Sequence, residues 1–271
     1  MSAQFVIGID LGTTNSVLAY SVLNVEHPQV QLLPIPQVVA ANTIESRSML
    51  PSFFYQCTQN ESAARTFSVP WNEDATFTVG HGARALSAEF PDRTVGAAKS
   101  WLGHSRIDRH QPILPWHAAD DVTKFSPVTV SRRYLEHLVA AWHQAFPDAP
   151  VADQHVVLTV PASFDASARD LTREAALAAG LPDSFVLLEE PQAATYAWLN
   201  TVGDRWRKLL KVGDRMLVCD IGGGTTDLTL VEVSEESGQL TLQRAAVGNH
   251  LLVGGDNMDL ALAHYVAELF E

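Results

Sequence analysis

The sequence predicts an α/β protein built from two related lobes, and three observations lead to that prediction. Between about residues 126 and 200, apolar runs of strand length alternate with segments of helical periodicity. A short motif near the N-terminus recurs about 210 residues later. Hydrophobic residues make up 46% of the 271 residues, so the chain has enough apolar surface for one large domain or two smaller ones.

The repeated motif consists of two apolar runs joined by a short polar turn. Residues 5–19 read FVIGIDLGTTNSVLA, and residues 216–230 read MLVCDIGGGTTDLTL. In both copies an apolar run leads to Asp, an apolar residue and Gly, and then to Thr-Thr and a second apolar run. Each copy predicts a β-hairpin with a polar turn. Two copies this far apart indicate related lobes rather than a short-period solenoid.

The first half of the segment between the two copies is irregular. Residues from about 20 to 125 are rich in Pro, Gln, Ser and aromatic residues. We expect strands at 50–57 and 76–79 there, a helix from about 80 to 89, and another helix around Lys99.

The second half is regular, and its first element is a helix. We expect Ser131 to be the N-cap of this helix, which ends before Pro147. Apolar side chains at helical spacing should be buried along it: Tyr134, Leu135, Leu138, Val139 and Trp142.

Strands and helices then alternate. His155–Val160 reads as a buried strand, and Asp165 or Ser167 begins an Ala-rich helix that closes at Gly180. Phe185–Leu188 is a second strand, and a helix follows Pro191.

The last part of the chain looks like the beginning of the second lobe. Residues 201–214 read as a connection, and 256–271 as a helix. That helix should bury the apolar residues Met258, Leu262, Val266 and Leu269. Because no Gly, Asn or Pro ends it, we expect a fragment that stops inside or just after a helix.

The composition argues against some classes of partner and favours one cellular compartment. The formal net charge of −13 argues against a nucleic-acid groove or an anionic membrane surface as partner. The N-terminus resembles a strand rather than a signal peptide, and no apolar stretch approaches the roughly 18–20 residues of a membrane span. Cys57 and Cys219 lie in apolar, strand-like runs, which predicts buried, reduced thiols and a cytoplasmic location.

The turn of the first copy has the chemistry of a phosphate site. Gly12 allows a tight turn that brings backbone N–H groups close to an anion, and polar side chains follow at Thr13, Thr14 and Asn15. Asp10, at the strand end, can hold Mg²⁺ through water, because this ion keeps most of its hydration shell. Taken by itself, the motif is also compatible with an ordinary polar turn.

The second copy favours the functional interpretation. Asp220 is followed by Gly222, Gly223, Gly224 and Thr225. If the two turns face each other, they form a two-sided phosphate clamp with one carboxylate from each side.

An ordered series of motifs resembles the 70-kDa heat-shock chaperones of the DnaK type. The series runs through nearly all 271 residues and comprises Ile7–Ser16, Leu50–Phe53, Val79-Gly80, Ala98–Gly103, Thr159–Phe164, Glu190–Ala194, Cys219–Thr225 and Gly254–Asp256. The resemblance implies an actin-like ATPase fold of the ribonuclease-H-like type, with two lobes. It also implies ATP or ADP and Mg²⁺ as ligands, and unfolded polypeptide clients and co-chaperones as partners, in protein folding and the stress response.

The resemblance also implies a role for individual residues. Lys99 matches the lysine that reaches the terminal phosphate and orients the attacking water, and Glu190 matches the carboxylate that helps to place that water. Asp10 and Asp220 match the aspartates around the metal, to which both bind through water, as does Glu190. The nucleotide-binding positions are Gly12, Thr13, Thr14, Asn15, Gly222, Gly223, Gly224, Thr225 and Gly255, and Asp227 matches a further nearby acid.

Two more positions resemble an allosteric relay. Pro161 matches a proline switch and Arg169 a relay arginine, which together report the nucleotide state to a peptide-binding domain. The alternatives are a loop proline after a strand and a solvated helix arginine. A sugar kinase of the same fold has no use for the pair.

The sequence departs from the family pattern in several places. Ser100 replaces the usual arginine, Asp256-Asn257 replaces the common Glu-Asp pair, and the segments 21–48 and 59–75 are long. These departures indicate a divergent bacterial member of the family.

We expect a first lobe at 1–200, with a smaller subdomain at about 40–125, and an incomplete second lobe at 201–271, without a peptide-binding domain. For the chain by itself we expect a well-folded first lobe and weak nucleotide binding. The alternative functions are a sugar or acetate kinase of the same superfamily and an actin-like filament protein.

Overall fold

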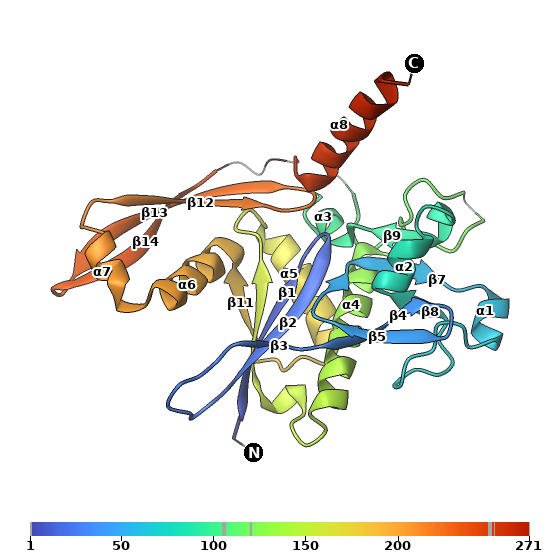
Figure 1. Ribbon diagram of the computed structural model, residues 1–271, viewed down its shortest axis with the longest axis horizontal. Coiled ribbons are helices and arrows are strands. Elements are labelled where there is room, and N and C mark those ends of the chain that lie inside the picture. The colour runs from blue at the N-terminus through green and yellow to red at the C-terminus, as the bar shows by residue number, and fades with distance from the viewer. Residues whose placement is uncertain (1, 105–106, 120, 249–250, 252, 271) are drawn as a thin grey trace. The chain divides into compact units, whose positions relative to one another are not determined.

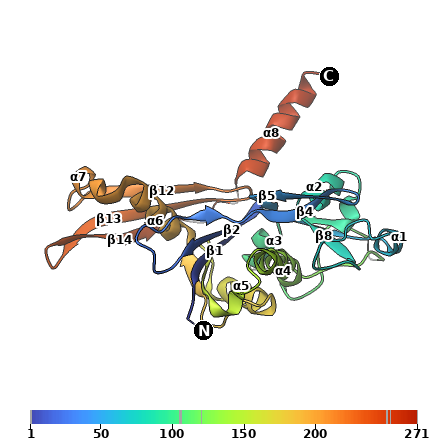
Figure 2. The ribbon, with the colours of Figure 1, turned by 60° about the horizontal axis from the view of Figure 1, so that its bottom comes forward.

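The computed structural model describes residues 2–104, 107–119, 121–248, 251 and 253–270. The chain divides into two compact units (Figures 1 and 2). The first unit comprises Met1–Leu158 and Asp165–Leu187, and the second comprises Thr159–Phe164 and Leu188–Glu271. The predicted lobe boundaries at residue 200 and around the smaller subdomain stay predictions.

The main sheet has six strands, with β1 and β2 at its centre. Its order is β11-β10-β1-β2-β3, and β6 also pairs with β2. The bounds are β1 Phe5–Leu11, β2 Asn15–Val22, β3 Gln31–Leu32, β6 Leu50–Pro51, β10 His155–Val160 and β11 Val186–Glu189. Strands β1 and β2 are antiparallel, so the first predicted hairpin is confirmed.

Helix α4 (Pro127–Ala145) packs on β1 and β2 and runs beside α5 (Ala166–Ala178) (Figure 2). The five apolar side chains predicted to be buried along α4 are all buried. At its C-terminal end, four aromatic rings cluster with centroids 4.4–6.0 Å apart: Phe5, Tyr20, Trp142 and Phe146. This aromatic cluster joins the helix to the sheet.

The predicted start of α4 is wrong by one turn. Ser126, not Ser131, is the N-cap, because its Oγ accepts the Thr129 N–H at 3.1 Å and Pro127 takes the first helical position. Ser131 lies inside the helix and is fully buried. In contrast, Asp165 caps α5 as expected, through the Ala168 N–H at 2.7 Å.

The segment from residue 33 to 103 forms smaller sheets and short helices. The hairpin β4–β5 was not predicted, although Asn42 adopts the left-handed conformation typical of a turn residue. The predicted strands and helices appear as β7, β8, α2 and α3. The bounds are β4 Ile35–Ala40, β5 Thr43–Arg47, β7 Phe53–Gln56, α1 Gln59–Ala63, β8 Phe77–Val79, α2 His81–Leu86, a 3-10 turn Pro91–Arg93, β9 Thr94–Gly96 and α3 Ala98–Leu102.

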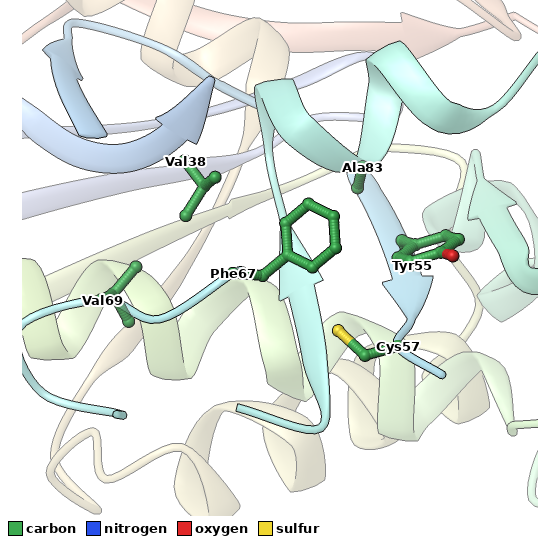
Figure 3. Packing of buried hydrophobic residues seen from close by; sticks show 6 residues of the cluster. All are labelled: Val38, Tyr55, Cys57, Phe67, Val69 and Ala83. Atoms are coloured by element: carbon green, nitrogen blue, oxygen red, sulfur yellow. The ribbon is translucent and has the colours of Figure 1, made fainter. Parts of the chain in front are cut away.

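A second hydrophobic core lies in this region. Figure 3 shows its side chains, which come from β4, β7 and the residue after it, α2, and the segment between α1 and β8: Val38, Tyr55, Cys57, Phe67, Val69 and Ala83. Burial, aided by the nearby Glu61 carboxylate, raises the pKa of the Cys57 thiol to about 12. The prediction of a buried, reduced thiol is confirmed at Cys57.

The second unit contains a three-stranded antiparallel sheet of order β12-β13-β14. Its first two strands form the second predicted hairpin, which is also confirmed. Strand β14 was not predicted, although the turn before it, Ser237-Gly238, has the positive φ angles and the Ser-Gly sequence typical of a tight hairpin. The bounds in this unit are α6 Glu190–Val202, α7 Trp206–Leu209, β12 Arg215–Ile221, β13 Thr226–Glu236, β14 Gln239–Val247 and α8 Gly255–Glu268, with a 3-10 turn at Gly203–Arg205. The first unit also contains a 3-10 turn at Val151–Asp153, just before β10.

Two predictions of burial fail in this unit. Cys219 is exposed, because it lies on the face of β12 that also carries the exposed side chains of Leu217 and Ile221. Helix α8 forms as predicted, but no described residue of it is buried, and it extends away from the β12–β14 sheet (Figure 1). The apolar spacing of α8 therefore has no described partner surface. Across the described residues, no helix is long and apolar enough to cross a membrane.

Candidate nucleotide site

The first candidate phosphate turn, Gly12–Thr14, joins β1 to β2. A Cβ atom on Gly12 would lie 2.2 Å from the Asn15 carbonyl oxygen, a distance that real Cβ atoms do not adopt. Only glycine therefore fits this turn as it stands. Thr13, Thr14 and Asn15 are partly exposed, and Asp10 is exposed one residue before the end of β1.

Ser52 stabilises the backbone of this turn through two hydrogen bonds. Its Oγ donates to the Gly12 carbonyl oxygen at 2.7 Å, and its N–H donates to the Thr14 carbonyl oxygen at 2.9 Å. The Ser52 and Ser16 hydroxyl oxygens lie 3.0 Å apart. Because Ser52 is 1% exposed, these bonds do not compete with bulk water.

Tyr134 of α4, in the core, is hydrogen-bonded to Ser52 in turn. Its hydroxyl donates to the Ser52 carbonyl oxygen at 2.9 Å, and burial raises the pKa of that hydroxyl well above its usual range. Ser52 and Tyr134 were not identified as site residues from the sequence. Ser52 lies in the Leu50–Phe53 motif, which carried the resemblance but no role for this residue. Tyr134 has the spacing of an ordinary core residue and lies 82 positions from Ser52.

Lys99 lies in the same unit, on the short helix α3. The residue is 8% exposed, which is uncommon for lysine. Ala97 precedes the helix in the left-handed conformation, with φ of 53°, and α3 has no side-chain N-cap.

The second candidate turn, Gly222–Thr225, joins β12 to β13. The Gly222 N–H donates to the Thr225 carbonyl oxygen at 2.8 Å and closes the turn. The beginning of α8 lies against it, because the N–H groups of Gly255 and Asp256 donate to the Gly222 and Gly223 carbonyl oxygens at 2.9 and 2.8 Å. A Cβ on Gly254 would lie 2.5 Å from both of those oxygens.

Asn257 stabilises this contact. Its side-chain oxygen accepts the Gly254 N–H at 2.9 Å, in the manner of a residue that caps a helix start. Although Asp256-Asn257 departs from the family pattern, Asn257 still provides a side-chain oxygen that accepts a hydrogen bond at the start of α8.

Two acidic residues flank the second turn, and two more lie where β11 meets α6. Asp220 on β12 is directly opposite Asp227 on β13, and Asp227 is buried. Like charges at directly opposed positions repel each other. Glu190 begins α6, while the Glu189 carboxylate next to it forms an ion pair with Arg244.

The structure places the two candidate relay residues in different units. Pro161 is buried and follows β10 in the segment assigned to the second unit. Arg169 lies in the first turn of α5, in the first unit, and is partly buried.

Each unit contains one of the two candidate phosphate turns. In the first unit, the structure brings together the Gly12–Asn15 turn and the residues that support it, Ser52 and Tyr134. In the second, it brings together the Gly222–Thr225 turn, Gly255 and the Asp220–Asp227 pair. A side chain would clash at Gly12 in the first turn and at Gly254, which lies against the second turn, and backbone and hydroxyl donors suit an anion. The donor set thus fits phosphate, and the carboxylates fit a hydrated Mg²⁺.

Comparison with known proteins identifies related chains. A family model described as Hsp70 protein matches residues 6–271. The chaperone protein HscA of Enterobacter sp. (strain 638) is 31% identical over 277 residues, which cover 98% of this chain and 38% of the relative. HscA of Salmonella agona (strain SL483) is 32% identical over 273 residues, which cover 96% and 37%. The chaperone protein DnaK of Stenotrophomonas maltophilia (strain R551-3) is 28% identical over 282 residues, which cover 98% and 38%. The chain therefore spans less than two-fifths of the length of these relatives.

Proposed function

The chain belongs to the Hsp70 family, whose ATPase domain has the actin-like fold, and on that premise we propose that it couples ATP hydrolysis to the binding and release of unfolded polypeptide. The observation that carries this proposal is the repeated hairpin. Each copy forms as predicted, and each turn is built around glycine and held by buried or backbone hydrogen bonds.

The two turns are proposed to bind the nucleotide phosphates. The residues concerned are Gly12, Thr13, Thr14 and Asn15 in the first unit, and Gly222, Gly223, Gly224, Thr225 and Gly255 in the second. Phosphoryl transfer depends mainly on positioning and on stabilising charge, so turns that are already rigid suit the reaction.

The carboxylates are proposed to hold the metal. Asp10, Asp220 and Glu190 would bind Mg²⁺ through water, and Asp227, opposite Asp220, adds negative charge nearby. When bound, the ion neutralises phosphate charge. Each of these carboxylates then accepts hydrogen bonds from hydrating water.

Lys99 and Glu190 are proposed to act on the reacting groups. The Lys99 ammonium group would contact the terminal phosphate and stabilise the negative charge that develops there. The Glu190 carboxylate would orient the attacking water. The low exposure of Lys99, at 8%, supports this role, because a charge is more effective where water is excluded.

Communication with a peptide-binding domain is proposed to use Pro161 and Arg169. Partners would be unfolded polypeptide clients and co-chaperones of the full-length protein, in the cytoplasm. The family membership supports partners of this class, and the net charge of −13 supports the expectation that nucleic acid is not among them.

The test is Mg²⁺-dependent ATP hydrolysis by the full-length protein, with and without an unfolded peptide. We expect slow turnover that the peptide accelerates and that Lys99→Ala reduces to a small residual rate. Lys208→Ala is the matched control, because Lys208 is exposed on α7, and it should hydrolyse ATP like the wild type.

Other outcomes would favour the alternatives. Turnover that depends on a sugar or on acetate and ignores peptide would assign the protein to the kinases of the superfamily. Nucleotide-dependent sedimentation would indicate a filament protein. Nucleotide binding without any hydrolysis would refute the ATPase and leave a nucleotide sensor.

A further inference from the structure

Helix α3, which carries Lys99, buries Ala98 and Leu102 but has few hydrogen bonds that hold its ends. It is five residues long and has no side-chain N-cap. The Ser100 hydroxyl is buried and has no hydrogen-bond partner among the described residues. A helix this short does not hold its shape through its own hydrogen bonds, so the placement of Lys99 depends on contacts from outside the helix.

Arg109 supplies such a contact at the C-terminal end of α3. Its Nη1 donates to the Leu102 carbonyl oxygen at 2.8 Å, and Leu102 is the last residue of the helix. A cation is favourable at this end, because the final carbonyl groups have no partner within the helix. The Arg109 side chain is only 14% exposed, which strengthens the interaction.

The other side of the same guanidinium group contacts α5. Arg109 Nη2 donates to Ser167 Oγ at 2.6 Å, and Nη1 lies 3.9 Å from Oδ1 of Asp165, the N-cap of the helix. Both residues belong to the start of α5, which also carries Arg169 in its first turn. The planar arginine fork thus joins the end of α3 to the beginning of α5.

We infer that Arg109 is a positioning residue for Lys99 and links α3 to the helix that carries Arg169. This inference rests on the proposed function. Arg109 contacts the main chain of α3 three residues after Lys99, so it acts through the placement of the helix and not on the reacting atoms. A catalytic group that is misplaced by about 1 Å can slow the reaction about a hundredfold. Loss of Arg109 should therefore lower turnover more than it lowers nucleotide affinity.

The first test uses kinetics in the full-length protein. Arg109→Ala should lower kcat for ATP hydrolysis about tenfold and change the ATP dissociation constant less than threefold. Arg109→Lys should restore only part of the activity, because an ammonium group does not span both acceptors. The control is Arg47→Ala, since Arg47 pairs with Glu45 in the β4–β5 hairpin and should leave kcat unchanged.

A double-mutant cycle separates positioning from a general loss of stability. If Arg109 acts through Lys99, then adding Arg109→Ala to Lys99→Ala should lower the residual rate no further. An additional tenfold loss in that background would overturn the inference.

Amide hydrogen exchange of the full-length protein tests the link without using activity. Arg109→Ala should speed exchange over residues 97–103, while exchange over α4 stays at the wild-type rate. Unchanged exchange at 97–103 refutes the link, even when the wild type hydrolyses ATP normally. A wild type without hydrolysis refutes the proposed function instead, and with it the catalytic consequence of Arg109.

Discussion

Gly12 occupies a position in the first turn that excludes every side chain. Its hydrogen atom takes the place of a Cβ that would lie 2.2 Å from the Asn15 carbonyl oxygen. The same oxygen-to-carbon conflict recurs in the second unit at Gly254, which lies against the Gly222–Thr225 turn. At the scale of single residues, the first candidate phosphate turn requires glycine at position 12, and the contact of α8 with the second turn requires glycine at position 254.

Substituting Gly12 tests this requirement. Gly12→Ala should displace the turn and weaken ATP binding by the full-length protein at least tenfold, which corresponds to about 1.4 kcal/mol. Gly8→Ala is the control, because a Cβ on Gly8, in the preceding strand β1, meets no atom within 4 Å. Calorimetric titration measures both variants. Equal affinity for ATP in Gly12→Ala and the wild type would contradict the steric explanation.

His137 gives a prediction for the pH dependence of stability. Its Nε2 lies 2.8 Å from the Pro36 carbonyl oxygen, which can only accept, so the neutral ring carries its proton on Nε2. Burial lowers the pKa of His137 from 6.5 to about 4, against a smaller opposing effect of the hydrogen bond. Because the unfolded state binds a proton more readily, the stabilisation is complete above pH 6.5 and is lost as the pH falls towards 4.

The expected loss between pH 6.5 and 4 is about 3 kcal/mol from this residue. His137→Gln keeps an N–H donor for the Pro36 carbonyl oxygen and removes the titration. Urea unfolding at several pH values should show the wild type losing more stability than the variant on acidification. Parallel curves for the two proteins would show that His137 does not titrate as described.

At the scale of elements, the N-cap of a helix is the residue directly before the first helical residue, so it depends on where the helix begins. Ser126 and Ser131 are both followed by residues suited to a helix, but Pro127 starts the helix one turn earlier than the apolar spacing indicates. Ser131 is consequently a buried hydroxyl with no hydrogen-bond partner among the described residues.

The two serines should respond oppositely to removal of the hydroxyl group. Ser126→Ala removes the bond to the Thr129 N–H and should lower the free energy of unfolding by about 1 kcal/mol. Ser131→Ala removes a buried, unsatisfied group and should be neutral or slightly stabilising. Denaturant unfolding measures both variants, and a larger loss for Ser131→Ala would restore the cap expected from the sequence.

At the scale of the whole molecule, the two units differ in how much of their surface is covered. In the first unit, α4 is packed against sheet and helices and buries side chains along its length. In the second, α8 buries none of its described residues, and apolar side chains such as Leu262 and Tyr265 are each 60% exposed. Secondary structure without tertiary packing contributes little stability by itself.

Hydrogen exchange of the 271-residue chain should show this difference directly. We expect strong protection over Pro127–Ala145 and rapid exchange over Gly255–Glu268, because isolated helices of about 14 residues are marginal in water. Within α8, only the first turn should exchange more slowly, since its N–H groups bond to Gly222 and Gly223. Protection of the whole of α8 equal to that of α4 would contradict the picture.

The sequence by itself determined the repeated hairpins, the positions of glycine, aspartate and lysine in the candidate site, and the family. These features are local or are repeated at matching positions, so spacing and residue type suffice to recognise them. The missed β14 also had a local signal in Ser237-Gly238. Only the tertiary structure decided which residues hold the site in place. Ser52 and Gly12 are 40 positions apart, and Arg109 and Ser167 are 58 apart. It also decided that Cys219 and the apolar residues of α8 are exposed, because burial depends on whether another element covers a face, and a periodic pattern carries no information about that element.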